Sequence, residues 1–311
     1  MTIAPPICRC CGSERVTLCG KKPGEFIRRD FEFHACSDCG FIMVEPFSGF
    51  EIYNDAYYRG AGPDPYVDYE SEYKNWRHTD RLREFRDLHQ LATRFLSSSL
   101  SPSVSPSSAP LQWLDFGCGA GGFLKYLREQ GQVAGRKLEL TGHDVGSYAT
   151  LLKAQDRFRI LDLDELGGEP DERYDVISLI EVIEHLPAPV EPLQLIARLL
   201  KPGGLLLLTT GNLESPVARR QGIHYRYCAP EIHVSLFNPR SLAALYRRVG
   251  LVPLPVRYHG AVQFKVLKSL RHRRGLRALA ATALALPFFT RAVDALFGVS
   301  AMPCAIKPSS P

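Results

Sequence analysis

The sequence lacks the segments that mark secreted or membrane-spanning proteins. Residues 1–6 carry no positive charge followed by an apolar stretch and lead directly into cysteines, so we expect no secretory signal. The apolar run Ala278–Phe289 has twelve residues, too few to cross a bilayer. No internal repeat is visible. We therefore expect a cytoplasmic protein.

The sequence also lacks a strong excess of charge of one sign. The formal net charge is +5 over 311 residues, which permits nucleic-acid, nucleotide-sugar or membrane-surface partners but selects none of them. With 45% hydrophobic and 23% charged residues, the composition is that of an ordinary globular protein. The length allows one large domain and a small one, and the oligomeric state stays open.

Cysteines, in contrast, are numerous and clustered. In a reducing compartment, clustered cysteines indicate metal ligands rather than disulfides. Two Cys-x-x-Cys pairs, each followed by a glycine that allows a sharp turn, predict a structural zinc site within residues 1–50, with the ligands Cys8, Cys11, Cys36 and Cys39. Between the pairs we expect a hairpin, with Phe31–Cys36 as a strand that enters the second pair. Cys10 and Cys19 are spare thiols, and a redox role for either pair is the alternative.

A glycine-rich turn between a predicted strand and a predicted helix carries the main functional signal. Gly117, Gly119 and Gly122 fit a dinucleotide-binding fingerprint. However, Asp115 lies two residues before the first glycine, where a carboxylate would repel a pyrophosphate. A ligand with an ammonium group, such as S-adenosylmethionine (SAM), would instead be attracted. Asp144, at the end of a predicted second strand, can accept both ribose hydroxyls. In the alternative interpretation both acids are ordinary strand-end or capping residues.

Strands and helices alternate in residues 111–311, which predicts a doubly wound parallel sheet. A Ser/Pro-rich linker at 97–110 precedes this domain. Residues 51–96 are aromatic and helical, and either cover a bound cofactor or pack the zinc module onto the next domain. Ligands of doubly wound sheets lie at the C-terminal strand ends, where four acids are expected: Asp115, Asp144, Asp162 and Glu181.

The C-terminal part carries a basic-flanked apolar segment at 271–291 within a helical insertion expected near 265–298. The segment either packs on the rest of the domain or makes a peripheral membrane contact that would suit a lipid-linked acceptor. A last strand is expected at Ala301–Lys307.

Several further motifs follow one another between residues 111 and 251. They are Leu-Asp-Phe-Gly-Cys-Gly-Ala-Gly from Leu114, Gly142-His-Asp144, Tyr174-Asp-Val-Ile, Glu181-Val-Ile-Glu-His185-Leu and Leu200-Lys-Pro-Gly-Gly-Leu. In this order they resemble the class I SAM-dependent methyltransferase family. The resemblance implies a Rossmann-like sheet, SAM as methyl donor, and a cofactor site containing Asp115, Gly117, Gly119, Gly121, Asp144, Asp162, Leu163 and Glu181. Asp164 is an alternative to Asp162.

With its zinc-binding head, the chain is similar to a bacterial subgroup that includes sugar C-methyltransferases. We do not recognise the further C-terminal domain that often follows in that subgroup. The resemblance therefore does not identify the methyl acceptor of this chain.

Methyl transfer to oxygen or carbon needs alignment of the substrates and removal of a proton, and a histidine suits the second task near pH 7. His185 follows the fourth strand, and His233 lies in a Glu-Ile-His block with Glu231. Either histidine is a candidate base, with Glu231 as a further catalytic candidate. In the alternative interpretation His185 only forms hydrogen bonds within its loop.

The sequence thus predicts a SAM-dependent methyltransferase with a structural zinc module that acts on an oxygen or carbon of a small molecule or sugar. One alternative is an rRNA or tRNA methyltransferase whose zinc head grips nucleic acid, although that head lacks a dense basic and aromatic stripe. Another is a non-catalytic SAM-binding zinc protein that mediates interactions.

Overall fold

The computed structural model describes residues 6–64, 68–79, 81–99, 109–254, 275, 300–301 and 304–308. The expected insertion near 265–298, the segment 271–291 and most of the linker at 97–110 lie outside the described residues, apart from residue 275. Within the described ranges, no helix is both long enough and apolar enough to serve as a membrane span.

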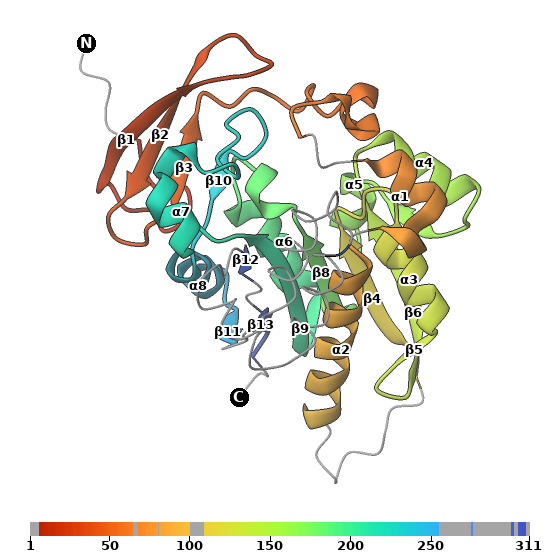
Figure 1. The fold of residues 1–311 in the computed structure, drawn as a ribbon. Helices are drawn as coiled ribbons and strands as arrows, with labels where there is room; N and C mark the ends of the chain where they lie inside the picture. Colours follow the sequence, from red (N-terminus) through yellow and green to blue (C-terminus); the bar gives the residue numbers. More distant parts are fainter. Residues whose placement is uncertain are drawn as a thin grey trace.

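A nine-stranded sheet forms the centre of the molecule (Figure 1). The strand order is β11-β13-β9-β8-β4-β6-β5, with β7 beside β6 and β12 beside β9. Strands β9, β8, β4, β6 and β7 run parallel, as the sequence predicts. The strands are β4 (Leu111–Phe116), β5 (Gln132–Val133), β6 (Arg136–His143), β7 (Arg159–Leu161), β8 (Tyr174–Ile180), β9 (Leu200–Gly211), β11 (Val252–Leu254), β12 (Ser300–Ala301) and β13 (Cys304–Ile306).

Antiparallel strands extend the parallel part of the sheet at both edges. Strands β12 and β13 pair antiparallel with β9, β11 pairs antiparallel with β13, and β5 pairs antiparallel with β6. The sheet is mixed because the chain returns past β9 in the opposite direction, and because β5 and β6 form a tight hairpin. The strand expected at Ala301–Lys307 is present as the short segments β12 and β13.

Helices cover both faces of this sheet because side chains alternate along its strands. On β8, Val176 packs with the cluster formed by α2 and α3, whereas Ile177 and Leu179 pack with α6 and α8. Each fully buried Leu or Ile contributes about 1.5–3 kcal/mol of transfer free energy. The helices are α2 (Leu82–Ser99), α3 (Gly122–Gln130), α4 (Ser147–Ala154), α5 (Leu163–Gly167), α6 (Val190–Leu199), α7 (Pro216–Gln221) and α8 (Pro239–Arg248).

The N-terminal residues build a second, four-stranded sheet in the order β1-β2-β3-β10. Strands β1 (Val16–Pro23), β2 (Asp30–Cys36) and β3 (Ile42–Glu45) are antiparallel, which confirms the predicted hairpin and the strand that enters the second cysteine pair. Strand β10 (Ser235–Leu236) adds to β3. The N-terminal segment therefore shares a sheet with a loop that lies far along the chain (Figure 1).

The aromatic and helical region joins the two sheets. It contains the short helical turns η1 (Tyr57–Ala61) and η2 (Trp76–His78), and the helix α1 (Tyr69–Asn75) between them. Asp68 caps α1 by accepting a 2.9 Å hydrogen bond from the Ser71 N–H. Helix α2 follows, and its buried Phe85 and Leu88 pack against α3.

Candidate active site

The glycine turn after β4 has the backbone conformation that glycine favours. Gly117, Gly119 and Gly121 have φ angles of 78°, 53° and 75°. Asp115, at the end of β4, is 2% exposed and accepts a 2.6 Å hydrogen bond from Ser178 Oγ. Burial raises the pKa of Asp115 to about 7, although this hydrogen bond and the charge of a nearby arginine oppose the rise.

Asp144 lies next to the same turn, directly after β6. Its Oδ2 accepts a 2.8 Å hydrogen bond from the Gly119 N–H, and its Oδ1 accepts a 2.7 Å hydrogen bond from the Gly146 N–H. Asp162 follows β7 and caps α5 by accepting a 2.8 Å hydrogen bond from the Glu165 N–H, and the neighbouring Leu163 is exposed. Asp115, Asp144 and Asp162 thus lie at the C-terminal ends of the neighbouring strands β4, β6 and β7.

The aromatic region packs directly on this turn. A Cβ at Gly119 would collide with the Tyr69 ring, and one at Gly146 would collide with the Tyr58 hydroxyl. Both tyrosines lie within ring-contact distance of Tyr148 on α4, with centroids 6.4 Å and 6.2 Å away. The aromatic region therefore packs on the glycine turn, and its role as a cover over a bound cofactor stays a prediction.

Arg81, just before α2, is a candidate residue that sequence reasoning missed. Its guanidinium lies 3.6 Å from Glu72 and 3.4 Å from Glu84. Burial alone would lower the pKa of Arg81, because it disfavours the charged guanidinium. The charges of the two carboxylates outweigh this effect and raise the pKa above its ordinary value. Glu72 in turn contacts the position where a Cβ of Gly122 would stand, at the start of α3. No sequence signal marks Arg81, because a lone arginine before an amphipathic helix resembles an ordinary surface residue.

A second group of polar side chains meets beyond the end of β8. Glu184 is fully buried and accepts hydrogen bonds from the Tyr227 hydroxyl and, at 2.9 Å, from Thr210 Oγ1. The ring of His233 lies 4.9 Å from that of His185 and 4.2 Å from that of Tyr227. The structure therefore brings the two predicted histidines together. It adds Glu184 and Tyr227, which the sequence did not single out as catalytic.

Glu181 lies between this cluster and the glycine turn. It has a left-handed φ of 56°, and its Oε2 accepts a 3.4 Å hydrogen bond from the Tyr227 hydroxyl. The next residue, Val182, contacts the position where a Cβ of Gly117 would stand. The loop after β8 thus connects the predicted cofactor turn to the histidines.

Hydrogen bonds and burial define the state of both histidines. His233 Nδ1 lies 2.7 Å from the Tyr227 carbonyl oxygen, and His185 Nδ1 lies 3.0 Å from the Ile232 carbonyl oxygen. Burial lowers the pKa of His185 to about 4 and that of His233 to about 3, so both rings are neutral at pH 7. A carbonyl only accepts, which assigns the proton of the neutral His233 ring to Nδ1 and leaves a lone pair on its Nε2. The His185 ring faces the carbonyls of both Ile232 and Glu181 as well as the Tyr53 hydroxyl, so these contacts do not assign its proton to one nitrogen.

Tyr53, from the aromatic region, completes this network. Its hydroxyl lies 2.8 Å from His185 Nδ1 and donates a 3.1 Å hydrogen bond to the Ile232 carbonyl. The cluster therefore contains two neutral imidazoles and the buried carboxyl of Glu184, whose pKa burial raises above its ordinary value. These groups can accept a proton. The ligand atoms of Glu184, His185 and His233 lie within 4.8 Å of one another, so they could also hold a divalent cation.

Glu231, a predicted catalytic residue, does not join the cluster. Its side chain is 3% exposed, and its Oε1 accepts hydrogen bonds of 2.6 Å and 2.7 Å from the N–H groups of Phe26 and Ile27. These residues lie in the turn between β1 and β2. The carboxylate thus binds the N-terminal sheet, and the acid beside the histidines is Glu184.

The four predicted metal ligands converge at the N-terminus. The sulfur atoms of Cys8 and Cys39 are 3.7 Å apart, those of Cys11 and Cys36 are 3.6 Å apart, and all four lie within 4.8 Å of one another. A tetrahedral zinc ion with Zn–S bonds of about 2.3 Å requires S–S separations of about 3.8 Å. The site therefore fits zinc. Cys10 is not one of these four; its thiol donates a 3.1 Å hydrogen bond to the Ser241 carbonyl and also interacts with the Cys39 thiol.

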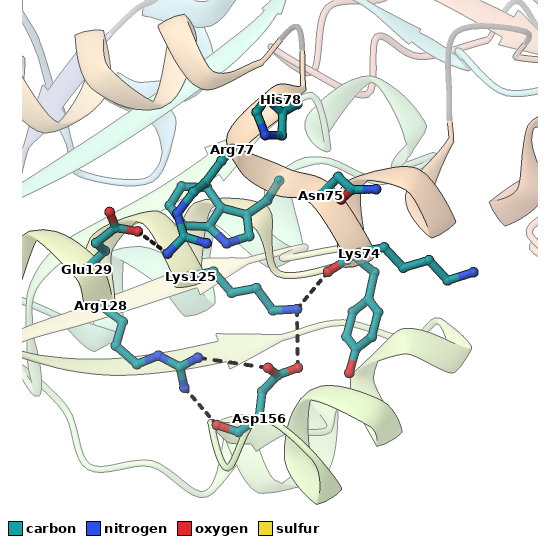
Figure 2. Close-up of a pocket in the computed structure, with 10 residues that line it drawn as sticks. Lys74, Asn75, Arg77, His78, Lys125, Arg128, Glu129 and Asp156 are labelled. Atoms are coloured by element: carbon teal, nitrogen blue, oxygen red, sulfur yellow. Dashed lines mark hydrogen bonds and ion pairs between the residues drawn. The ribbon is translucent and has the colours of Figure 1, made fainter.

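A separate cavity of about 530 Å³ lies between η2, α3 and the end of α4 (Figure 2). Lys125 contacts Asp156 at 3.3 Å, and Arg77 contacts Glu129 at 2.7 Å, so these lining cations are paired with acids of the chain. The lining contains none of the predicted site residues. The candidate catalytic and cofactor-binding residues therefore lie at the strand ends and not in this cavity.

The mixed sheet, the glycine turn and the acids that follow β4 and β6 together define a class I methyltransferase fold. A family model described as a methyltransferase domain matches residues 76–256, well over half of the chain. The chain belongs to this family.

Curated relatives carry a more specific name. A ubiquinone biosynthesis O-methyltransferase from Leptothrix cholodnii is 34% identical over 136 residues, which cover 43% of this chain and 57% of that protein. The match thus spans little more than half of the relative's length. The protein of the same name from Bordetella bronchiseptica is 28% identical over 192 residues, covering 57% of this chain and 76% of that protein.

Among solved structures, a SAM-dependent methyltransferase from Archaeoglobus fulgidus is similar. It has 17% sequence identity and a TM-score of 0.44, and the match covers 76% of this chain and 96% of that one.

Proposed function

We propose that this methyltransferase uses SAM to methylate an oxygen or carbon of a small-molecule acceptor. The observation that carries the proposal is the adjacency of two groups: the glycine turn with Asp115 and Asp144, and the buried cluster of Glu184, His185 and His233. The first group suits a cofactor with an ammonium group and ribose hydroxyls. The second offers proton acceptors one loop away. The names of the curated relatives support oxygen as the accepting atom.

In the proposed reaction, SAM supplies an already activated methyl group, and the protein mainly aligns the substrates. Asp115 and Arg81 would bind the ammonium and carboxylate of its amino-acid end, and Asp144 would bind the ribose hydroxyls. Glycines 117, 119 and 121 would allow close backbone approach, with Asp162 and Leu163 near the adenine. The neutral His233, through Nε2, or the neutral His185 would take the acceptor proton.

Zinc is a further part of the proposal. The sulfur separations support a structural site at Cys8, Cys11, Cys36 and Cys39, because they match a tetrahedral set of thiolates. Zinc there would fix the two turns that begin and end the β1–β2 hairpin. It would supply stability to a small sheet, and it takes no part in the methyl transfer.

Calorimetry with S-adenosylhomocysteine (SAH) tests the cofactor assignment, and methyl transfer from labelled SAM to catechols, phenols, deoxysugars and RNA tests the acceptor class. We expect SAH binding that is weakened in Asp144→Ala, and transfer to a small molecule that is lost in His185→Gln or His233→Gln. Transfer to RNA alone would favour the nucleic-acid alternative. Binding of SAH without transfer to any acceptor would favour the non-catalytic one, and no binding of SAH would refute the proposal.

Metal dependence of turnover distinguishes two roles of the histidine cluster. If the histidines act as bases, a chelator that leaves the cysteine site intact does not change the rate. If they hold a divalent cation with Glu184, the chelator abolishes transfer and added Mg²⁺ or Mn²⁺ restores it.

A further inference from the structure

The loop that follows η4 (Gly222–His224) supplies the backbone carbonyls on which both histidines depend. The Tyr227 carbonyl accepts the hydrogen bond from His233 Nδ1, and the Ile232 carbonyl lies 3.0 Å from His185 Nδ1. The loop closes on itself, because the Ala229 carbonyl accepts a 2.8 Å hydrogen bond from the His233 N–H. A displacement of this loop would therefore change the partners of both rings at once.

Glu231 is the side chain that fixes this loop to the rest of the protein. Its Oε1 accepts two short hydrogen bonds from the hairpin turn, at Phe26 and Ile27. The fit is close, because a Cβ at Gly24 would lie 2.8 Å from the same oxygen. A buried carboxylate that binds two backbone N–H groups forms charge-assisted hydrogen bonds, which are about twice as strong as neutral ones. The loop is thus held at its centre.

Other contacts attach the same loop to the same sheet. Lys22 Nζ donates a 2.9 Å hydrogen bond to the Cys228 carbonyl, and the Val44 N–H donates a 3.0 Å hydrogen bond to the Val234 carbonyl. Strand β10 then pairs with β3. The cysteine-bearing sheet therefore contacts the loop at several points along its length.

We propose that Glu231 is a positioning residue that, through the β1–β2 turn, holds the loop carbonyls on both histidines and so fixes the Nδ1-protonated tautomer of His233. The inference rests on the proposed function, because it concerns the groups that would take the acceptor proton. It gives the cysteine-bearing sheet a role in the active site. The sheet keeps the Nε2 lone pair of His233 available without contacting the substrate.

Nitrogen NMR of ¹⁵N-histidine-labelled protein at pH 7.5 tests the proposal without an acceptor, with signals assigned by His185→Gln and His233→Gln. In the wild type we expect the His233 ring to be protonated at Nδ1. In Glu231→Ala we expect His233 to show a mixture of tautomers. Glu231→Gln keeps an acceptor oxygen and should retain the wild-type signals.

Two further variants keep the test decisive. Glu165→Ala removes a carboxylate that also binds a backbone N–H, that of Asp162 at 2.9 Å, but far from the cluster, so the histidine signals should not move. Gly24→Ala displaces the Glu231 oxygen from the opposite side and should reproduce the effect of Glu231→Ala if that variant does not fold. Unchanged histidine signals in a folded Glu231→Ala or Gly24→Ala protein would overturn the proposal.

Calorimetry with SAH separates this inference from the proposed function. A wild type that fails to bind SAH refutes the proposed function and leaves the tautomer result standing. Once an acceptor is in hand, Glu231→Ala should lower kcat/KM for it about 10- to 100-fold, as is typical when the partner of an active-site histidine is lost. The affinity for SAH should stay within about twofold of the wild type, since Glu231 touches no group of the glycine turn.

Discussion

Replacing Asp115 by asparagine should stabilise the protein while weakening its cofactor site. Asp115 is nearly fully buried, and burial raises its pKa from the ordinary value of 3.8 to about 7. A difference of about 3 between the two pKa values, at about 1.4 kcal/mol for each pKa unit, corresponds to about 4 kcal/mol. The asparagine keeps an oxygen that can accept the Ser178 hydrogen bond and carries no charge to bury.

The sign of the pH dependence follows from the protons bound in each state. Below pH 3.8 the Asp115 carboxyl is protonated in both the folded and the unfolded chain, so it contributes no difference. Between pH 4 and pH 7 the unfolded chain loses the proton and the folded chain keeps it, so the free energy of unfolding falls as pH rises. Above pH 7 both states are ionised and the loss stays constant. Asp115→Asn removes this loss.

Urea unfolding of the ligand-free wild type and of Asp115→Asn, at intervals from pH 5 to pH 8, measures the effect. The advantage of the variant in free energy of unfolding should grow with pH and approach at most about 4 kcal/mol near pH 7. SAH affinity should rise with pH in the wild type, because the ligand's ammonium favours the ionised carboxylate, and should be weaker and independent of pH in the variant. An equal affinity in both proteins, together with a constant difference in stability, would refute this reasoning.

Three other variants, one of them with a matched control, give independent expectations. Cys36→Ser should remove the single zinc ion expected per chain, and zinc retained in metal analysis would contradict the assigned ligands. Gly119→Ala should abolish measurable SAH binding because its Cβ meets the Tyr69 ring. Gly131→Ala has a similar φ of 71° with open space around its Cβ, and it should lose only about 1–3 kcal/mol of stability with normal binding. Arg81→Met should weaken SAH binding about 10- to 100-fold, as expected for a lost hydrogen bond between charged groups, and calorimetry showing an unchanged affinity would exclude Arg81 from the site.

The central strands were predictable because long apolar segments alternate with amphipathic helices. The short strands β5 and β10 were not, because they have only two residues each, and the antiparallel pairing of the expected last strand with β9 was not predicted either. Such short segments carry no periodic signal, and their pairing depends on where the rest of the chain places them. The addition of β10 to the N-terminal sheet is therefore a tertiary result that local sequence does not encode.

The candidate site, too, was predictable from the sequence only in part. Asp115 and the glycines could be proposed from the sequence because they lie within one turn, at the spacing of a glycine-rich ligand-binding loop. Glu231 and His233 were proposed together because they lie two residues apart in one Glu-Ile-His block. The segment is a turn closed by the bond from the His233 N–H to the Ala229 carbonyl, so the two side chains point to different partners. Arg81 reaches its place through tertiary packing alone.

The pairing of β3 with β10 has a consequence for recombination between related enzymes. Because one strand of the N-terminal sheet comes from residues 235–236, the cysteine-bearing segment is not a cassette that can be exchanged by joining chains near residue 50. A chimaera would leave β3 facing a foreign partner and Glu231 facing a foreign turn. We expect residues 8–45 and 224–238 to be kept together, both in evolution and in engineered chimaeras, although they lie far apart in the sequence.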